Sequence, residues 1–370
     1  MIKFLNTFKS ILISSLYFDN WKIPPQRDIL IYDEARTKII EKYLEKKNYT
    51  ILNVRYINNN SLNFYVIFKL ILSLKLSPKN YKTEYIELVS PKFIISMIDT
   101  NYGFYRLKKQ FPKIKIILIQ FAWRHNIVDS IPVGEINKDG DIKNQVDFFI
   151  VFNDYVKKEF QKIIKAEYLA FGSFTSNSFK INKGNFYYKY LLVGQNTNPK
   201  QRNIKITEGV TLEEYLQTDR EVCKILAKFI NERKKEKLNI LGKSEDHNSA
   251  KKLYDNLLGK ENYNYIGKSG YSYGLIDKSE FIFGTTSTLL YEALSRRKKV
   301  GMFNPKSKIK IYEKTAFGWP ALEEKRGPFW TNSIEIDEIN RVVNFLESVS
   351  EKDWNILLKE RFDHLMAYDE

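Results

Sequence analysis

One run of the chain, residues 280–295, combines the residue types that bind phosphate groups in α/β proteins. A short apolar stretch leads through a glycine into hydroxyl residues, and a helical pattern follows. Serine and threonine cap helices, and the first turn of a helix presents N–H groups at the positive end of its dipole, where anions bind. The candidate ligands are Gly284, Thr286, Ser287, Thr288 and, one turn further on, Glu292, whose carboxylate would reach a ribose or sugar hydroxyl. A plain capped helix with Glu292 in solvent fits the same pattern.

Polar residues also stand at the ends of four other apolar runs that we interpret as strands, 28–33, 93–98, 115–120 and 190–193. The run 190–193 ends in Gly194 and Gln195, which we assign to the same ligand as residues 284–292. Open parallel sheets bind their ligands at the carboxyl ends of the strands. After the run 115–120, an amide, a guanidinium and an imidazole come together in the sequence. From these we assign substrate recognition to Gln120, Arg124 and Asn126.

Two residues at these strand ends are the catalytic candidates, Asp99 and His125. A carboxylate at such an edge acts as a general base or a nucleophile, and an imidazole transfers protons near neutral pH. Asp99 fits the cap of the next helix equally well, and His125 fits an ordinary loop position. Asp33 and Glu34, at the end of the first strand, rank behind these two.

No metal or redox cofactor is expected. The run Asp139-Gly-Asp141 has the form that holds Mn²⁺ or Mg²⁺ in metal-dependent transferases, but Lys138 and Lys143 flank it and no apolar strand precedes it. An Asp-Gly turn is therefore the favoured interpretation. The sequence has no Gly-x-Gly-x-x-Gly run, no paired cysteines and no His-Glu-x-x-His, so dehydrogenase, zinc and ATPase functions have no support.

The elements that must position these residues alternate between apolar strand-like runs and helical patterns along the whole chain, as parallel βαβ units do. A length of 370 residues suits two such domains. We place an N-terminal, acceptor-side domain at 1–172, an irregular connection at about 172–187 and a nucleotide-binding domain at 188–350. A terminal helix at 351–370 is expected to return to the N-terminal domain.

The composition of the chain indicates which cellular compartment and which binding partners to expect. One cysteine, Cys223, excludes an internal disulfide and favours a reducing compartment. The net charge of +16 attracts anions in general, but the basic residues are dispersed, which argues against nucleic acid. The longest apolar stretch, 64–76, contains Lys69 and Lys75 and is too short to span a bilayer. Residues 1–18 form an amphipathic pattern that either packs or lies on a membrane surface. We therefore expect a cytoplasmic protein, with peripheral contact at the inner face of the membrane left open.

Several segments resemble bacterial surface carbohydrate (O-antigen type) biosynthesis proteins. These segments are 284–300, 317–320, 327–332, 149–154, 171–174 and 119–120. More remotely the chain looks like capsule Kdo transferases and the CDP-glycerol glycerophosphotransferases of teichoic acid synthesis. The resemblance implies a GT-B fold, with two Rossmann-like domains whose parallel sheets face each other across a cleft, and it gives Thr286, Ser287, Thr288 and Glu292 the donor-nucleotide role. Where the Kdo transferases carry Gln-Asp-Gly, this chain has Gln120-Phe-Ala, so that aspartate has no counterpart here.

The sequence thus predicts a metal-independent glycosyltransferase that uses a nucleotide-activated sugar, with CMP-linked Kdo or a nonulosonic acid favoured by the resemblance. The acceptor is expected to be a glycan or glycolipid of the cell surface. Two alternatives stay open: a glycerophosphate-type transferase with a CDP-linked donor, and a non-catalytic carbohydrate-binding assembly factor.

Overall fold

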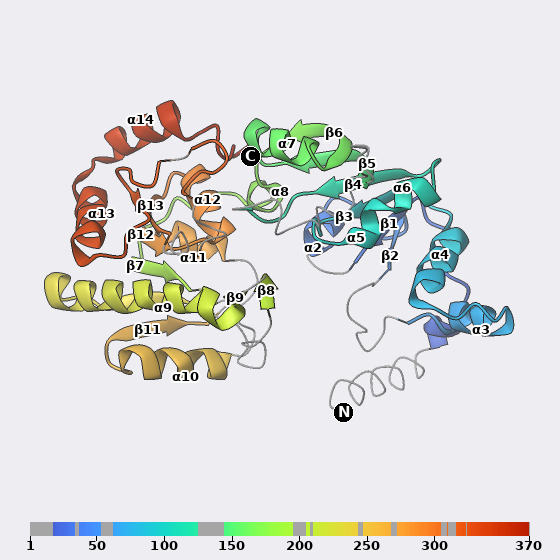
Figure 1. Ribbon diagram of the computed structural model, residues 1–370, viewed down its shortest axis with the longest axis horizontal. Coiled ribbons are helices and arrows are strands. Elements are labelled where there is room, and N and C mark those ends of the chain that lie inside the picture. The colour runs from blue at the N-terminus through green and yellow to red at the C-terminus, as the bar shows by residue number, and fades with distance from the viewer. Residues whose placement is uncertain are drawn as a thin grey trace. The chain divides into compact units, whose positions relative to one another are not determined.

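The computed structural model describes residues 18–33, 37–52, 62–124, 144–194, 205–207, 210–242, 247–267, 272–304, 309, 316–322 and 324–369. The chain forms two compact units (Figure 1). The first consists of Met1–Phe121, Ile131–Val151 and Phe160–Leu169, and the second of Ala122–Ser130, Phe152–Glu159 and Ala170–Glu370. The terminal helix that the sequence predicts is counted in the second unit.

A six-stranded sheet forms the centre of the first unit. Its strands, in spatial order, are β2 (Tyr49–Leu52), β1 (Ile29–Tyr32), β3 (Phe93–Ser96), β4 (Lys115–Ile119), β5 (Asn144–Val151) and β6 (Ile164–Ala170). The pairs from β2 through β5 are parallel. The inner strands are runs of isoleucine, leucine and phenylalanine because a parallel sheet is covered on both faces. Leu30, Ile94 and Ile116 accordingly have no exposed surface.

Short helices precede or connect these strands, and residues 154–159 of the last helix are counted in the second unit. They are η1 (Phe18–Trp21), α2 (Thr37–Glu41), α3 (Phe64–Leu72), α4 (Pro78–Val89), α5 (Tyr102–Tyr105), α6 (Leu107–Gln110) and α7 (Asp154–Gln161). Their boundaries follow local chemistry. Ser77 caps α4, accepting a hydrogen bond from the Asn80 amide, and Pro78 occupies the first helical turn, where its missing N–H is harmless.

The second unit repeats this organisation around another six-stranded parallel sheet. Its strands, in spatial order, are β11 (Tyr263–Ile266), β10 (Leu238–Leu241), β7 (Tyr188–Val193), β12 (Ser279–Gly284), β13 (Lys299–Phe303) and β14 (Trp330–Thr331). A separate antiparallel pair consists of β8 (Lys205–Thr207) and β9 (Val210–Thr211). The sequence pattern indicates 299–303 as the last strand of this sheet. That expectation is wrong, because β14 pairs with β13 through Met302 and Trp330.

Eight helical elements accompany the described strands of this unit. They are α8 (Phe174–Asn177), α9 (Leu212–Phe229), the π-helix η5 (Ile230–Lys234), α10 (His247–Leu258), α11 (Tyr273–Asp277), α12 (Thr288–Ser295), α13 (Ile336–Ser348) and α14 (Glu351–Arg361). A capping box starts α9, since Thr211 accepts from the Glu214 amide while the Glu214 carboxylate accepts from the Thr211 amide. No helix within the described ranges has the length and apolar content needed to cross a bilayer.

Candidate functional site

The turn between β12 and α12 has the local structure that the sequence predicts. β12 lies between β7 and β13, and it ends in Gly284. A Cβ on Gly284 would lie 2.9 Å from a methyl carbon of Leu290, so glycine lets the helix approach the strand end. Ser287 is the N-cap of α12, and its hydroxyl accepts from the Leu289 amide at 3.4 Å. Thr286, Ser287 and Thr288 are partly exposed, and the Leu290 amide donates to the Ser287 carbonyl at 3.0 Å.

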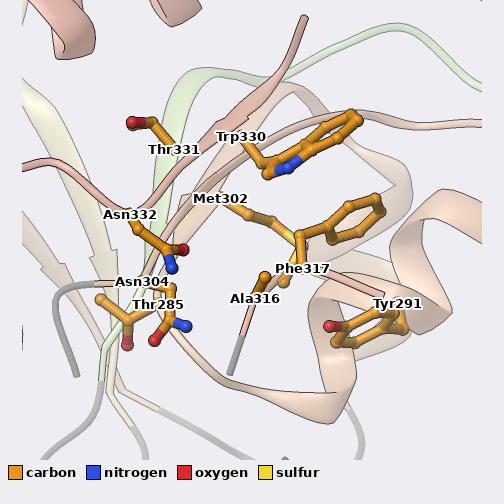
Figure 2. A pocket seen from close by; sticks show the side chains of 9 residues that line it. All are labelled: Thr285, Tyr291, Met302, Asn304, Ala316, Phe317, Trp330, Thr331 and Asn332. Atoms are coloured by element: carbon orange, nitrogen blue, oxygen red, sulfur yellow. The ribbon is translucent and has the colours of Figure 1, made fainter. Parts of the chain in front are cut away.

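The neighbouring strands end at the same edge and add polar groups to it. Asn304 follows β13 and Asn332 follows β14. A pocket between these strand ends is lined by Thr285, Tyr291, Met302, Asn304, Ala316, Phe317, Trp330, Thr331 and Asn332. Figure 2 shows Thr285, Asn304 and Asn332 together on one side of this pocket, with the rings of Tyr291, Phe317 and Trp330 on the other. The pocket thus has one wall of amide and hydroxyl groups and one aromatic wall.

A second pocket lies at the end of β7 and shares Thr285 with the first. Gly194 lines it and is tightly packed, since a Cβ there would lie 2.5 Å from the Tyr254 hydroxyl. Arg220 supplies the positive charge of this pocket, and its Nη2 lies 3.2 Å from the Glu213 carboxylate. Burial raises the pKa of the Cys223 thiol, which also lines the pocket, to about 12. Cys223 is therefore protonated at neutral pH and is no nucleophile.

Thr288 and Trp123 form a contact that sequence reasoning did not anticipate. The Trp123 backbone N–H donates to the Thr288 hydroxyl at 2.8 Å. The indole stacks on Tyr291 with ring centroids 3.9 Å apart and planes 7° apart. Tyr291 in turn accepts from the Gly318 amide at 3.1 Å, and burial raises the pKa of its hydroxyl. Residues 122–124 thereby hold α12 in place next to the turn.

Glu292 is buried rather than solvated. Its side chain is 6% exposed, and its carboxylate accepts from the Ser173 hydroxyl at 2.6 Å. Ser173 also caps α8 by accepting from the Ser176 amide at 3.1 Å. The plain alternative of a solvated Glu292 is therefore wrong. A donor-binding role for Glu292 stays a prediction, and Ser173 is the residue that would hold its carboxylate in position.

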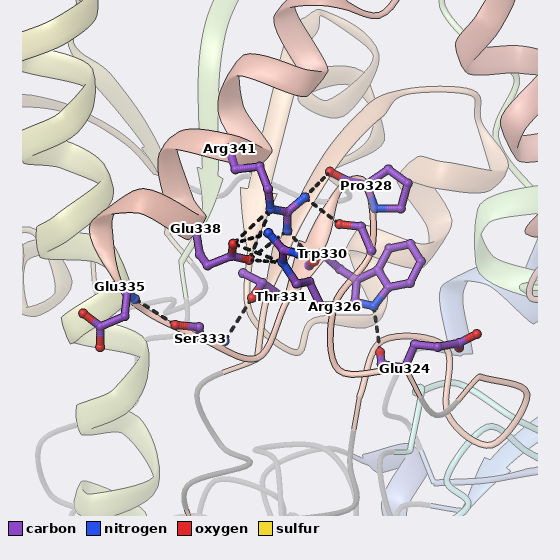
Figure 3. Close-up of polar contacts among 10 residues, drawn as sticks. Glu324, Arg326, Pro328, Trp330, Thr331, Ser333, Glu335, Glu338 and Arg341 are labelled. Atoms are coloured by element: carbon purple, nitrogen blue, oxygen red, sulfur yellow. Dashed lines mark hydrogen bonds and ion pairs between the residues drawn. The ribbon is translucent and has the colours of Figure 1, made fainter.

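A salt-bridge cluster fixes the strand that carries Trp330 and Thr331. Figure 3 shows the guanidinium groups of Arg326 and Arg341 converging on the Glu338 carboxylate. Arg341 also donates to the Gly327 carbonyl at 2.8 Å. Hydrogen bonds from Arg326 and then Arg341 lower the pKa of Glu338 from 4.5 to about 2. These contacts anchor the segment before β14 to α13 and so support the aromatic wall of the first pocket.

In the first unit, three buried polar residues follow three adjacent strands. Asp99 comes after β3 and has no exposed surface, and its backbone carbonyl accepts from the Tyr105 hydroxyl at 2.6 Å. Gln120 comes after β4 and is 2% exposed. Asp33, directly after β1, has a φ of 87°, a left-handed conformation that few residues other than glycine adopt. Because β1, β3 and β4 are neighbours in the sheet, Asp33, Asp99 and Gln120 follow strand ends at the same edge of it.

Of the remaining predicted residues, some lie within the part of the chain that the structure describes and others lie outside it. Arg124 is half-buried and belongs, with Trp123, to the second unit, whereas Gln120 belongs to the first. His125, Asn126, Gln195 and the Asp139-Gly-Asp141 turn lie outside the described residues. Within the described part of the chain, no three acidic, cysteine or histidine side chains gather as a metal site would require. Asn304 and Asn332 were missed, although Asn304 directly follows the apolar run of β13; Asn332 follows Thr331 at the end of the two-residue strand β14.

Comparison with solved structures shows the fold. The "putative UDP-N-acetylglucosamine 2-epimerase" of Listeria monocytogenes matches with a TM-score of 0.50 and 13% identity over 93% of this chain and 100% of that one. The wall teichoic acid polymerase TagF matches with a TM-score of 0.49 and 13% identity over 100% and 92%. A glycosyltransferase from Rickettsia africae ESF-5 matches with a TM-score of 0.45 and 12% identity over 92% and 96%. The fold is GT-B, as predicted.

Sequence comparison shows the family. No curated protein sequence matches the chain. A family model described as "putative O-antigen biosynthesis protein" matches residues 117–370, more than half of the chain, including all of the second sheet and the turn before α12. The protein therefore belongs to this O-antigen biosynthesis family.

Proposed function

We propose that the protein is a glycosyltransferase that moves a sugar from a nucleotide-activated donor to a surface-polysaccharide or lipopolysaccharide acceptor. The observation that carries the proposal is the turn at residues 284–288. It follows the strand between β7 and β13, its last three side chains are partly exposed, and it opens directly into α12. Backbone N–H groups at such a helix start stabilise a phosphate without a metal ion.

The two pockets beside this turn have volumes of about 10 and 20 Å³, room for about one water molecule each, so the ribose and base of a donor would have to widen them. A ribose or base needs hydrogen-bonding groups and a flat apolar surface, and the wall of Thr285, Asn304 and Asn332 faces the rings of Phe317 and Trp330. Gly194 and Gln195, at the end of β7, complete the proposed donor site. The resemblance favours a CMP-linked acidic sugar such as Kdo or a nonulosonic acid.

In the proposed reaction the acceptor hydroxyl oxygen attacks the anomeric carbon of the donor. The bond from that carbon to the phosphate oxygen breaks, and the nucleotide leaves with the bonding electrons. Asp99 or His125 takes the proton of the acceptor hydroxyl, while Gln120, Arg124 and Asn126 bind the acceptor. The start of α12 stabilises the negative charge that develops on the leaving phosphate.

Nucleotide titration tests the donor site. We expect CMP to bind more tightly than UDP or GDP in isothermal calorimetry of the full chain. Thr286→Val should weaken binding by about tenfold, because a hydrogen bond to a charged group contributes about 1.5 kcal/mol or more. Thr218→Val is the matched control, since Thr218 lies in α9 and its hydroxyl donates to the Tyr215 carbonyl. Failure of all three nucleotides to bind would refute the proposal.

Turnover distinguishes the alternatives. With a suitable acceptor, Asp99→Asn should reduce kcat and leave the KM for the donor unchanged if Asp99 is the base. Glycerol phosphate transfer from CDP-glycerol in place of sugar transfer would favour the glycerophosphotransferase. Tight nucleotide binding without release from any activated sugar would favour the assembly factor.

A further inference from the structure

Helix α3, in the first unit, exposes an unusually apolar surface. Its buried side consists of Val66 and Leu70. The opposite side and the turn after it carry five exposed apolar side chains, Phe68, Ile71, Leu72, Leu74 and Leu76, which we call the α3 surface. The exposed indole of Trp21 extends it, stacked on Phe64 with ring centroids 4.9 Å apart. An exposed apolar area of this kind marks an interaction site.

Leu74 provides the strongest indication that this surface has an external partner. It follows the C-cap Ser73 with a φ of 55°, in the left-handed position that glycine or asparagine usually occupies after a helix. A leucine side chain is sterically disfavoured in this conformation. Packing within the protein does not compensate, because the side chain is 94% exposed. Leucine at this position therefore stabilises nothing in the described fold that glycine would not.

Lysines carry the charges within residues 62–83, and the first acidic residue after them, Glu84, pairs with one of them. Residues 62–83 contain Lys69, Lys75, Lys79 and Lys82 and no aspartate or glutamate. Lys69 pairs with Glu84. Lys75 and Lys79 are exposed, and no carboxylate of the described residues lies within ion-pair distance of them. Lysines beside protruding leucines complement a surface that is negative at its headgroups and apolar beneath them.

We propose that the α3 surface docks on an anionic lipid bilayer. Leu74 and Leu76 enter the boundary between headgroups and acyl chains, while Lys75 and Lys79 contact the lipid phosphates. The leucines protrude from a turn instead of lining a groove, which suits a deformable bilayer better than a rigid protein partner. This inference goes beyond sugar transfer and does not depend on it.

Vesicle co-sedimentation of the full chain tests the proposal. We expect binding to phosphatidylcholine vesicles that contain phosphatidylglycerol and much weaker binding to phosphatidylcholine alone. The double change Lys75→Glu and Lys79→Glu should weaken binding at least about tenfold, because each lysine near an anionic surface contributes about 1 kcal/mol. Leu74→Gly should weaken it about tenfold while the melting temperature stays the same or rises. The matched control is Ile336→Ser, which removes an exposed isoleucine of α13 in the second unit.

Three results would overturn the proposal. The first is failure of the wild-type chain to sediment with either vesicle, and the second is a loss of binding in Ile336→Ser as large as that in Leu74→Gly. The third is a dimer in light scattering that Leu74→Gly converts to monomers, which would assign the surface to a second copy. If Leu74→Gly lowers the melting temperature, Leu76→Ser replaces it, since Leu76 is exposed and has an ordinary backbone conformation. Nucleotide binding is measured in parallel and should be unchanged in every variant.

Discussion

Replacing Glu338 by glutamine tests how the aromatic wall of the pocket is held. The Glu338 carboxylate receives Arg326 Nη2 at 2.8 Å and Arg341 Nη2 at 3.0 Å. Glutamine has nearly the same shape, so the substitution removes the charge and leaves the packing of α13 intact. Glutamine keeps one acceptor oxygen and places an NH2 donor where the other stood, so one of these two contacts is lost together with the ionic attraction that fixes both arginines.

The size and pH dependence of the effect follow from the pKa. Hydrogen bonds from the two arginines lower the pKa of Glu338 from 4.5 to about 2. Each tenfold change in proton affinity corresponds to about 1.4 kcal/mol. The Glu338 carboxylate can therefore contribute at most about 3 kcal/mol to the free energy of unfolding. Arg326 is 66% exposed and Glu338 20%, so solvent screens the pair, and we expect about 1 to 2 kcal/mol. Because the folded-state pKa is lowered, this stabilisation is complete above pH 4.5 and is lost as the pH falls towards 2.

Urea unfolding followed by tryptophan fluorescence measures the effect. Four of the five tryptophans, Trp123, Trp319, Trp330 and Trp354, belong to the second unit, so the signal reports mainly on the unit that contains Glu338. The free energy of unfolding of Glu338→Gln should fall below that of the wild type at pH 7. At pH 3 the difference should be less than half as large.

The control is Glu335→Gln, which removes the same charge at the start of the same helix. Glu335 is exposed, and within the described residues its carboxylate has no ion pair. If the free energy of unfolding falls as much in the control as in Glu338→Gln, the change in net charge is responsible for the fall. A loss that is the same at pH 7 and pH 3 would refute the role of the Glu338 carboxylate.

Three further substitutions rank the contacts of the second unit, each measured by urea unfolding. Asp277→Asn should lower the free energy of unfolding by about 3–5 kcal/mol, because Asp277 and Arg296 form a buried pair 2.6 Å apart; a loss under about 1 kcal/mol would mean that water reaches Arg296. Thr211→Ala should cost only about 1 kcal/mol, since it removes one helix cap, and an unchanged value would show that the capping box is not formed in solution. Trp123→Ala should cost about 3–5 kcal/mol through loss of the stack on Tyr291, and retention of wild-type stability would contradict that stack.

The sequence predicted what depends on neighbouring residues. The glycine, the Ser287 cap and the helix after β12 are local features, and they are present as expected. The periodic pattern that opens with Glu213 and Glu214 indicates a helix over 212–234, and this helix is present as α9 continued by η5. In each case residues a few positions apart determine the backbone conformation, so composition and periodicity suffice.

Features that depend on distant pairing were missed. Strand β14 has only two residues, and it exists because Trp330 and Thr331 pair with β13. Glu292 is buried because Ser173, 119 residues earlier, supplies the hydrogen-bond donor. The stack between Trp123 and Tyr291 likewise joins segments that no periodic pattern relates. His125, Asn126 and Gln195 lie outside the described residues and stay predictions.

At the turn of residues 284–288, side chains and backbone groups have different roles. Thr285 is hydrogen-bonded to Asp219, Thr288 accepts from Trp123, and Glu292 accepts from Ser173. These side chains hold the start of α12 against its neighbours. A phosphate at this helix start would compete with the Ser287 cap, because the Leu289 amide donates to the Ser287 hydroxyl and the Leu290 amide to the Ser287 carbonyl. Gly284 contributes as well, because a Cβ there would lie 2.9 Å from a methyl carbon of Leu290 and that side chain would have to shift. Hence loss of a single hydroxyl should weaken binding only moderately, and a side chain at position 284 should act mainly by moving Leu290.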